Sequence, residues 1–89
     1  MLPRSRHAAI RRTLARPGPA AVLAALVEAG ESVVVAEVRA RTGMTRPAVS
    51  VALQGLAQLG LAKRDPAGGK APSWTATPDG VRQQRENTP

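Results

Sequence analysis

The residues best suited to chemistry lie between positions 44 and 61, and the chemistry that they suit is hydrogen bonding rather than catalysis. When this stretch is drawn as a helix, one face contains no acidic residue. It is formed by Arg46, Ser50, Val51, Gln54 and Gln58. Glutamine can pair with adenine through two hydrogen bonds, and arginine can contact a base edge or a phosphate. Such a face fits the major groove of duplex DNA, so we interpret the stretch as a recognition helix.

The composition argues against an enzyme. The chain has 89 residues, a single histidine (His7) and no cysteine. Neither a nucleophile paired with a base nor a set of metal ligands can be assembled from these residue types. The sequence also lacks a glycine-rich phosphate loop. We therefore expect a protein without catalytic activity, cofactor, bound metal or small-molecule substrate.

The charge balance favours a polyanionic partner. Thirteen Lys and Arg residues and six Asp and Glu residues give a net charge of +7. Such an excess is typical of nucleic-acid binding and is less often found at acidic membranes. The basic start of the chain is expected to contact phosphates through Arg4, Arg6, Arg11 and Arg12. The alternative is that these charges only keep an alanine-rich chain soluble.

Local signals place the recognition helix at residues 45–59. Thr45 is a good N-cap, and Pro47 is tolerated in the first turn because amides there have no partner within the helix. Gly60 is expected to end the helix in the left-handed conformation. The buried face follows helical spacing and comprises Val49, Ala52, Leu53, Leu56 and Leu59.

The residues before this helix predict two more helices and a short strand. A first helix spans 19–29, and the β-branched run at 32–35 is a brief strand. A second helix spans 35–42 and ends at Gly43, which leaves the tight turn of a helix-turn-helix. The buried stripe of the first helix comprises Val22, Leu23, Leu26 and Val27.

Two arginines lie on the outer face of the second helix. Arg39 and Arg41 either touch phosphate or form a solvated surface, and both interpretations stay open here.

The residues after the recognition helix predict a hairpin and a last helix. Strands at 61–65 and 73–77 flank a loop rich in Gly and Pro. Trp74 is expected to pack against the domain rather than to stack on a base. A short helix follows at about 78–86. The basic residues of the hairpin are Lys63, Arg64 and Lys70.

We divide the chain into three parts. Residues 1–16 form a basic arm that is either disordered or a short helix, and Pro17-Gly18 interrupts either structure. Residues 17–82 form the domain, and residues 83–89 form a frayed tail. The stretches of apolar residues are too short to span a membrane, so we expect a cytoplasmic, nucleoid-associated protein.

Helix, strand, helix, turn, helix and hairpin in this order resemble the winged helix-turn-helix, a mostly helical α+β fold with a three-helix core, a two-stranded wing and a short extra strand. Stretches of the chain resemble the MarR-like group of bacterial regulators. The resemblance covers about residues 19–82 and is carried by VAEV at 35–38, RTGMTRPAVS at 41–50, LAQLGL at 56–61 and WTATPDG at 74–80.

The resemblance implies which residues face DNA. The wing would use Lys63, Arg64 and Lys70 on phosphates or the flanking minor groove. Val51 lies where such proteins often carry a basic residue, and the long dimerisation helices of full-length members are missing. The positions that face the major groove are Thr45, Arg46, Pro47, Ser50, Val51 and Gln54.

A smaller likeness links residues 69–74 to the wing of domains that bind left-handed Z-form nucleic acid. Those domains stack a tyrosine on the nucleic acid, and Gln54 takes its place in this chain.

The most specific hypothesis is a duplex DNA-binding regulator that acts as a homodimer. The alternatives are a sequence-tolerant architectural, replication or plasmid-maintenance factor, and a winged helix used for protein contact.

Overall fold

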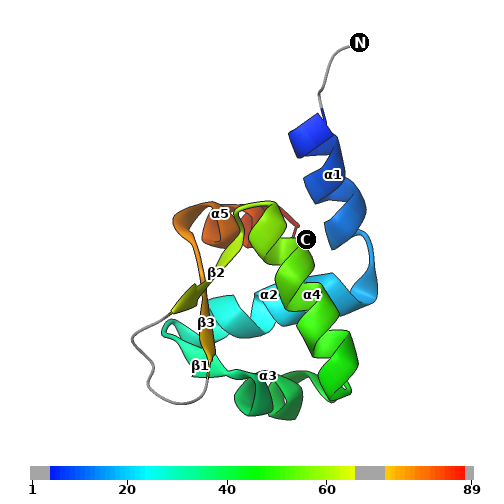
Figure 1. The fold of residues 1–89 in the computed structure, drawn as a ribbon. Helices are drawn as coiled ribbons and strands as arrows, with labels where there is room; N and C mark the ends of the chain where they lie inside the picture. Colours follow the sequence, from blue (N-terminus) through cyan, green and yellow to red (C-terminus); the bar gives the residue numbers. More distant parts are fainter. Residues whose placement is uncertain (1–4, 66–71, 88–89) are drawn as a thin grey trace.

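The computed structural model describes residues 5–65 and 72–87, which form five helices and three strands (Figure 1). In chain order the elements are α1 (Ser5–Leu14), α2 (Pro17–Ala29), β1 (Val33–Val34), α3 (Val35–Thr42), α4 (Arg46–Gln58), β2 (Ala62–Asp65), β3 (Ser73–Ala76) and α5 (Pro78–Asn87). This arrangement confirms the predicted winged helix-turn-helix. Helices α2, α3 and α4 form the three-helix core, and β2 and β3 form the wing.

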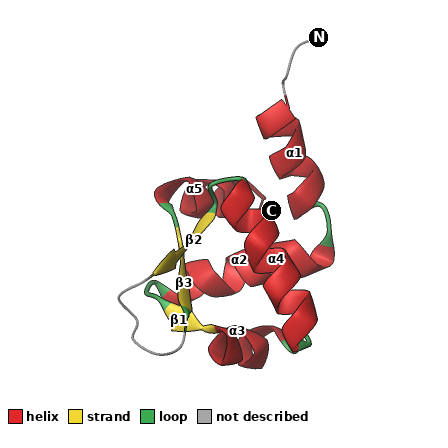
Figure 2. Cartoon of the chain, viewed as in Figure 1, coloured by secondary structure: helices red, strands yellow, loops and turns green. Residues whose placement is uncertain are grey.

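The three strands form one small antiparallel sheet in the order β1-β3-β2 (Figure 2). Strand β3 lies in the middle, where Trp74 stands opposite Val33 of β1 and Arg64 of β2. Trp74 is half-buried and packs against the hydrophobic core. The only aromatic residue of the chain therefore has the structural position that we expected.

Aliphatic side chains build the core, and α4 supplies a large part of it. The largest fully buried side chains are Ile10, Leu23, Leu26, Leu53, Leu56, Leu61, Val22, Val38 and Val49. Burying a leucine or valine contributes about 1.5–3 kcal/mol to folding. The face of α4 that carries Val49, Leu53 and Leu56 is therefore held inward.

The turn between α3 and α4 is closed by local contacts. Gly43 adopts a left-handed conformation with φ of 74°, and its N–H donates to the carbonyl of Arg39 over 2.7 Å. Thr45 then caps α4, because its Oγ1 accepts from the N–H of Ala48 at 3.3 Å. The helix-turn-helix geometry thus rests on the glycine and the N-cap that the sequence predicted.

The basic N-terminal segment is helical from Ser5 to Leu14, which decides between the two alternatives for it. Ile10 and Leu14 are buried and attach α1 to the domain. As predicted, the N-terminal helix does not continue through Pro17-Gly18, because α1 ends at Leu14. The next helix, which we expected to begin at residue 19, begins at Pro17, so Pro17 and Gly18 lie in the first turn of α2. Proline suits that turn because its fixed φ is helical and its missing N–H has no partner to lose.

The last helix continues further than the expected tail allowed. Residues 83–87 belong to α5, which ends at Asn87.

Among the helices of the described ranges, none combines the length and the apolar character that crossing a bilayer requires.

The end of α4 and the start of α5 are joined through Thr77. Its Oγ1 donates to the carbonyl of Gly60 at 2.6 Å and accepts from the N–H of Gly80 at 3.0 Å. Gly80 is buried here, and an added Cβ would lie 2.0 Å from the carbonyl oxygen of Leu61. Only glycine therefore lets the two segments approach this closely.

We expect Gly80→Ala to destabilise the protein by about 1–3 kcal/mol, because the methyl group overpacks against backbone that cannot move aside as a flexible side chain would. The free energy of unfolding from urea titration measures this loss. Gly55→Ala is the matched control, since a Cβ there meets nothing within 4 Å. Gly55 lies inside α4, so its replacement by alanine should stabilise the helix by up to about 1 kcal/mol. Equal stability of the two variants would contradict the close approach at Gly80.

Candidate nucleic-acid interface

The exposed surface of α4 divides into two stripes. Arg46, Ser50 and Gln54 follow one another at four-residue spacing and form a polar stripe, in which Ser50 is half-buried and the other two are exposed. Pro47 and Val51 begin the second, apolar stripe, and Val51 is 71% exposed. Residues four apart in a helix lie side by side, so each stripe is a continuous strip of surface. Neither Ser50 nor Gln54 is sealed beneath another part of the chain.

Neither α4 nor the sequence that directly flanks it contains an acidic residue. Between Val38 and Arg64 there is neither Asp nor Glu, whereas Arg46 and Lys63 lie within this range. An approaching phosphate therefore meets no carboxylate from α4 or from the turn before it. This surface has the electrostatic character that an anionic polymer requires.

A notch of about 280 Å³ lies between α3, the start of α4 and Pro72, which directly precedes β3. Arg39 and Arg46 both line it and are both exposed. Arg39 is steadied by a long hydrogen bond of 3.4 Å from its Nε to the carbonyl of Met44. The first turn of α3 has no side-chain cap and carries one acid, Glu37, which pairs with Arg41. The two guanidinium groups of Arg39 and Arg46, close together and without an ion pair to a described residue, form a surface that attracts phosphate. The lining residues are Val34, Val35, Ala36, Arg39, Arg46 and Pro72.

Arg39 and Arg41 lie in different environments. The Nε of Arg41 donates to Oε2 of Glu37 at 2.8 Å, in an ion pair between residues four apart on α3. This pair balances the charge of Arg41 locally. Arg39 forms no ion pair with a described residue and lies in the notch beside Arg46. The two arginines, which we treated alike in the sequence analysis, thus differ in their partners.

The structure describes two of the three basic residues that we predicted for the wing. Lys63 and Arg64 are exposed on β2, opposite Thr75 and Trp74 of β3. Successive residues of a strand point to opposite faces, so these two cations leave the sheet in opposite directions. Lys70, the third predicted wing cation, lies outside the described residues.

The loop end of the two wing strands is held by contacts of Asp65. Oγ of Ser32 donates to Oδ2 of Asp65 at 2.7 Å. Oγ of Ser73 donates to the backbone carbonyl of Asp65 at 3.5 Å. Ser73 and Asp65 are partners in the predicted hairpin, whereas Ser32 lies 33 residues before Asp65. Only the folded chain therefore identifies Ser32 as a residue that helps to orient the wing.

The arginines of α1 do not lie at this surface. Helix α1 lies at the opposite end of the molecule from the wing (Figure 1). Arg11 and Arg12 are exposed on α1, while Arg6 is bound to Leu59 and Asp79. Arg4 lies outside the described residues.

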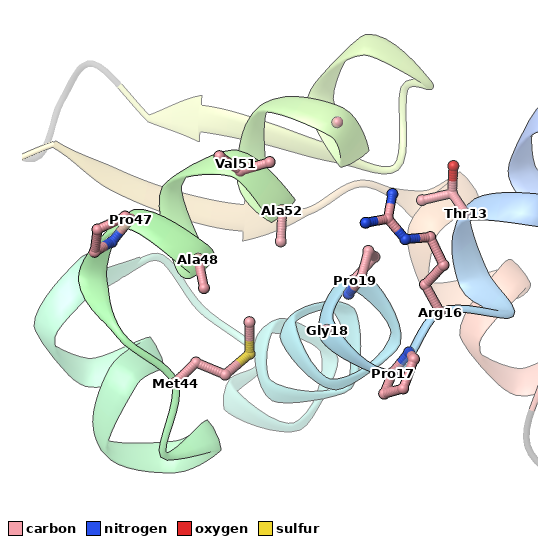
Figure 3. Close-up of a pocket in the computed structure, with 11 residues that line it drawn as sticks. Thr13, Arg16, Pro17, Gly18, Pro19, Met44, Pro47, Ala48, Val51 and Ala52 are labelled. Atoms are coloured by element: carbon pink, nitrogen blue, oxygen red, sulfur yellow. The ribbon is translucent and has the colours of Figure 1, made fainter.

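An apolar groove of about 570 Å³ follows the second stripe of α4. Figure 3 shows Pro47, Ala48 and Val51 on one side and the start of α2 on the other. Arg16 reaches into the same region and is its only basic residue. Arg16 is the last residue of the arm that we predicted at residues 1–16, and nothing local predicts that the α1–α2 junction packs beside α4.

Within the described ranges, no three His, Asp or Glu side chains gather where they could hold a metal ion. The groups that do gather at α4 are hydrogen-bonding and cationic side chains.

Comparisons with known proteins agree with this fold. The sequence model of the MarR family matches residues 12–71. The search among curated proteins found no match. Among solved structures, a MarR-family transcriptional regulator from Rhodococcus sp. RHA1 has a TM-score of 0.74 and 23% identity, covering 90% of this chain and 60% of that chain.

Two further structures are similar. The transcriptional repressor BigR from Xylella fastidiosa has a TM-score of 0.76 and 21% identity, covering 90% of this chain and 77% of that one. The PcaV transcriptional regulator from Streptomyces coelicolor, solved with its natural ligand, has a TM-score of 0.69 and 29% identity, covering 79% of this chain and 50% of that one. The chain thus spans only 50–60% of the length of PcaV and the Rhodococcus regulator.

We expect Thr45→Ala to lower the free energy of unfolding by about 1 kcal/mol, because the N–H of Ala48 loses its acceptor at the start of α4. Denaturant titration measures the change. Thr45→Ser and Thr45→Asp keep an acceptor at the N-cap and should retain most of the stability. If the alanine variant were as stable as the serine variant, Thr45 would not cap α4.

Proposed function

The chain belongs to the MarR family, and on this premise we propose that it binds duplex DNA as a small transcriptional regulator and catalyses no reaction. The observation that carries the proposal is the polar stripe of α4, which is open, free of acids and flanked by the notch of Arg39 and Arg46. Helix α4 would lie in the major groove, as the second helix of a helix-turn-helix does.

Base recognition would come from both stripes of α4. Arg46 and Gln54 have the side chains that pair bidentately with guanine and adenine, and Ser50 can bond to either kind of base edge. Val51, exposed on the apolar stripe, suits contact with a thymine methyl group. Thr45 and Pro47 at the start of the helix would approach the sugar–phosphate edge of the groove.

Phosphate contacts would fix the position of α4 on the duplex. Such contacts supply position and affinity but carry no sequence information directly. The notch of Arg39 and Arg46 is proposed as one of them, and Lys63, Arg64 and Lys70 as those of the wing. Arg41 is a weaker candidate because Glu37 already balances its charge.

A homodimer is the proposed form on DNA. One small module makes few base contacts, and two copies on a two-fold site would double them. Their half-sites would be centred about 34–36 Å apart, one turn of B-DNA. A duplex ligand would also place the protein at the nucleoid of the cytoplasm.

Selection of bound sequences from a random duplex pool tests the specific part of the proposal. We expect an enriched motif with two-fold symmetry, because α4 would read bases once in each copy. Thr45→Asp, which should keep the fold but places a carboxylate on the groove-facing surface, should lose most of this binding. Tight, salt-sensitive binding without any enriched motif would instead indicate a sequence-tolerant protein.

Arg39→Gln and Arg41→Gln form a matched pair on α3 for the phosphate contacts. We expect Arg39→Gln to weaken DNA binding and to reduce the slope of log K against log salt by about 0.9, the value for one lost phosphate contact. Arg41→Gln should change the slope less. Fluorescence anisotropy on a labelled duplex at several salt concentrations measures both. Equal effects, or none, would exclude the notch as a phosphate site.

A further inference from the structure

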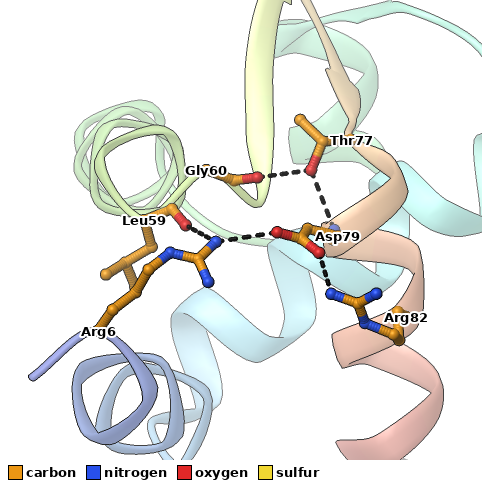
Figure 4. A network of polar contacts seen from close by, with 7 residues as sticks. Arg6, Leu59, Gly60, Thr77, Asp79 and Arg82 are labelled. Carbon is orange, nitrogen blue, oxygen red and sulfur yellow. Dashed lines mark hydrogen bonds and ion pairs between the residues drawn. The ribbon is translucent and has the colours of Figure 1, made fainter. Parts of the chain in front are cut away.

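Arg6 connects three elements that are far apart in sequence. Its Nη2 donates to the carbonyl oxygen of Leu59 at 3.1 Å and to Oδ2 of Asp79 at 2.9 Å (Figure 4). These partners lie 53 and 73 residues away along the chain. Arg6 comes from α1, Leu59 is the residue that ends α4, and Asp79 lies in the first turn of α5. One guanidinium group therefore meets both ends of the α4–α5 junction.

The contact with Leu59 has a clear physical basis. The last carbonyl groups of a helix have no partner within it, and the C-terminal end carries partial negative charge. After Leu59 the chain turns away through Gly60, whose φ is 77°. A Cβ on Gly60 would lie 3.4 Å from Nη2 of Arg6, so the guanidinium lies directly against this turn. Arg6 thus supplies a cationic cap to α4 from another helix.

Asp79 holds the guanidinium in this place. An acidic side chain in the first turn of a helix is stabilised by the positive end of the helix. Oδ2 of Asp79 accepts from Arg6, while Oδ1 accepts from Nη2 of Arg82 one turn further along α5. The same turn is tied to Gly60 through Thr77. Arg6 therefore closes a ring of contacts around the exit of α4.

We propose that Arg6 is a positioning residue that couples α1 to the recognition helix, and that it is not a phosphate contact. The proposal rests on the proposed DNA-binding function. At about 1.5 Å of rise per residue, Leu59 lies roughly 20 Å along the axis from Arg46. A guanidinium at that end, already bonded to a carboxylate and a carbonyl, is remote from the notch. A partner or ligand that moves α1 would act on the end of α4 through this residue, in addition to the core contacts of Ile10 and Leu14.

Loss of the Arg6–Asp79 ion pair should change the free energy of unfolding only slightly, because both side chains are partly exposed. The side chain of Arg6 is 57% exposed and that of Asp79 is 33% exposed. Exposed ion pairs contribute little to the free energy of folding. The attachment of α1 rests mainly on buried Ile10 and Leu14, so loss of Arg6 should leave the fold intact and change the orientation and local stability of the end of α4.

The test compares Arg6→Gln with Arg11→Gln and Arg12→Gln. All three remove one charge from α1, but Arg11 and Arg12 form no ion pair with a described residue. Amide hydrogen exchange on the free, full chain should become about two- to fivefold faster around residues 58–61 in Arg6→Gln and stay unchanged in the other two. Arg6→Lys, which retains a cation for Leu59 and Asp79, should restore part of the protection.

DNA binding gives the second measurement. We expect Arg6→Gln to weaken binding by about two- to fivefold without changing the salt slope, because a positioning residue releases no counterion. A slope reduced by about 0.9 with unchanged exchange would show that Arg6 contacts a phosphate and would overturn the proposal. Asp79→Asn combined with Arg6→Gln should cost no more than the larger single effect, and additive effects would exclude coupling through this pair.

The two readouts separate this proposal from the proposed function. If the wild-type chain bound no duplex DNA, the proposed function would fail, yet exchange at residues 58–61 would still decide whether Arg6 holds the end of α4. If wild-type binding were specific and exchange were the same in all three glutamine variants, only the role of Arg6 would be wrong.

Discussion

Burial of one face of α4 is the constraint on which the rest of the structure depends. Val49, Leu53 and Leu56 are completely buried and lie on one side of a helix of 13 residues. Because the helix repeats every 3.6 residues, holding that side inward leaves Arg46 and Gln54 outside. The core therefore orients the interface. A chain without Phe or Tyr achieves this with leucine and valine, while Trp74 packs against the same core from the wing.

The elements around α4 were predictable where their signals are local. Gly43 and Thr45 act within a few residues of their positions, so the bounds of α3 and the start of α4 followed from residue type. Four-residue spacing likewise predicted which side of α4 is exposed. The junction after α1 was misplaced because Pro17 can either interrupt a helix or begin one. The choice depends on the packing of α1 against the domain, which no short stretch encodes.

The side-chain partners were not predictable in the same way. Arg6 meets Asp79 across 73 residues, and Ser32 meets Asp65 across 33. Neither pair has a spacing that sequence analysis could use, whereas Glu37 and Arg41 are four apart on one helix and could have been paired beforehand. Sequence analysis treated the arginines as one pool of charge. The fold divides them into those that meet carboxylates and those that remain open.

This division changes what the net charge of +7 means for binding. Arg6 and Arg82 share the carboxylate of Asp79, and Arg41 pairs with Glu37. The cations near α4 that form no ion pair with a described residue are then Arg16, Arg39 and Arg46, joined by those of the wing. Each phosphate contact adds a limited, salt-dependent amount to the affinity for DNA. One copy of the chain offers few such contacts, so its affinity for DNA would be modest. Two copies on one DNA site would need their recognition helices held at a fixed distance from each other. Because Arg6 of α1 caps the end of α4, a change in the position of α1 would change the position of the recognition helix.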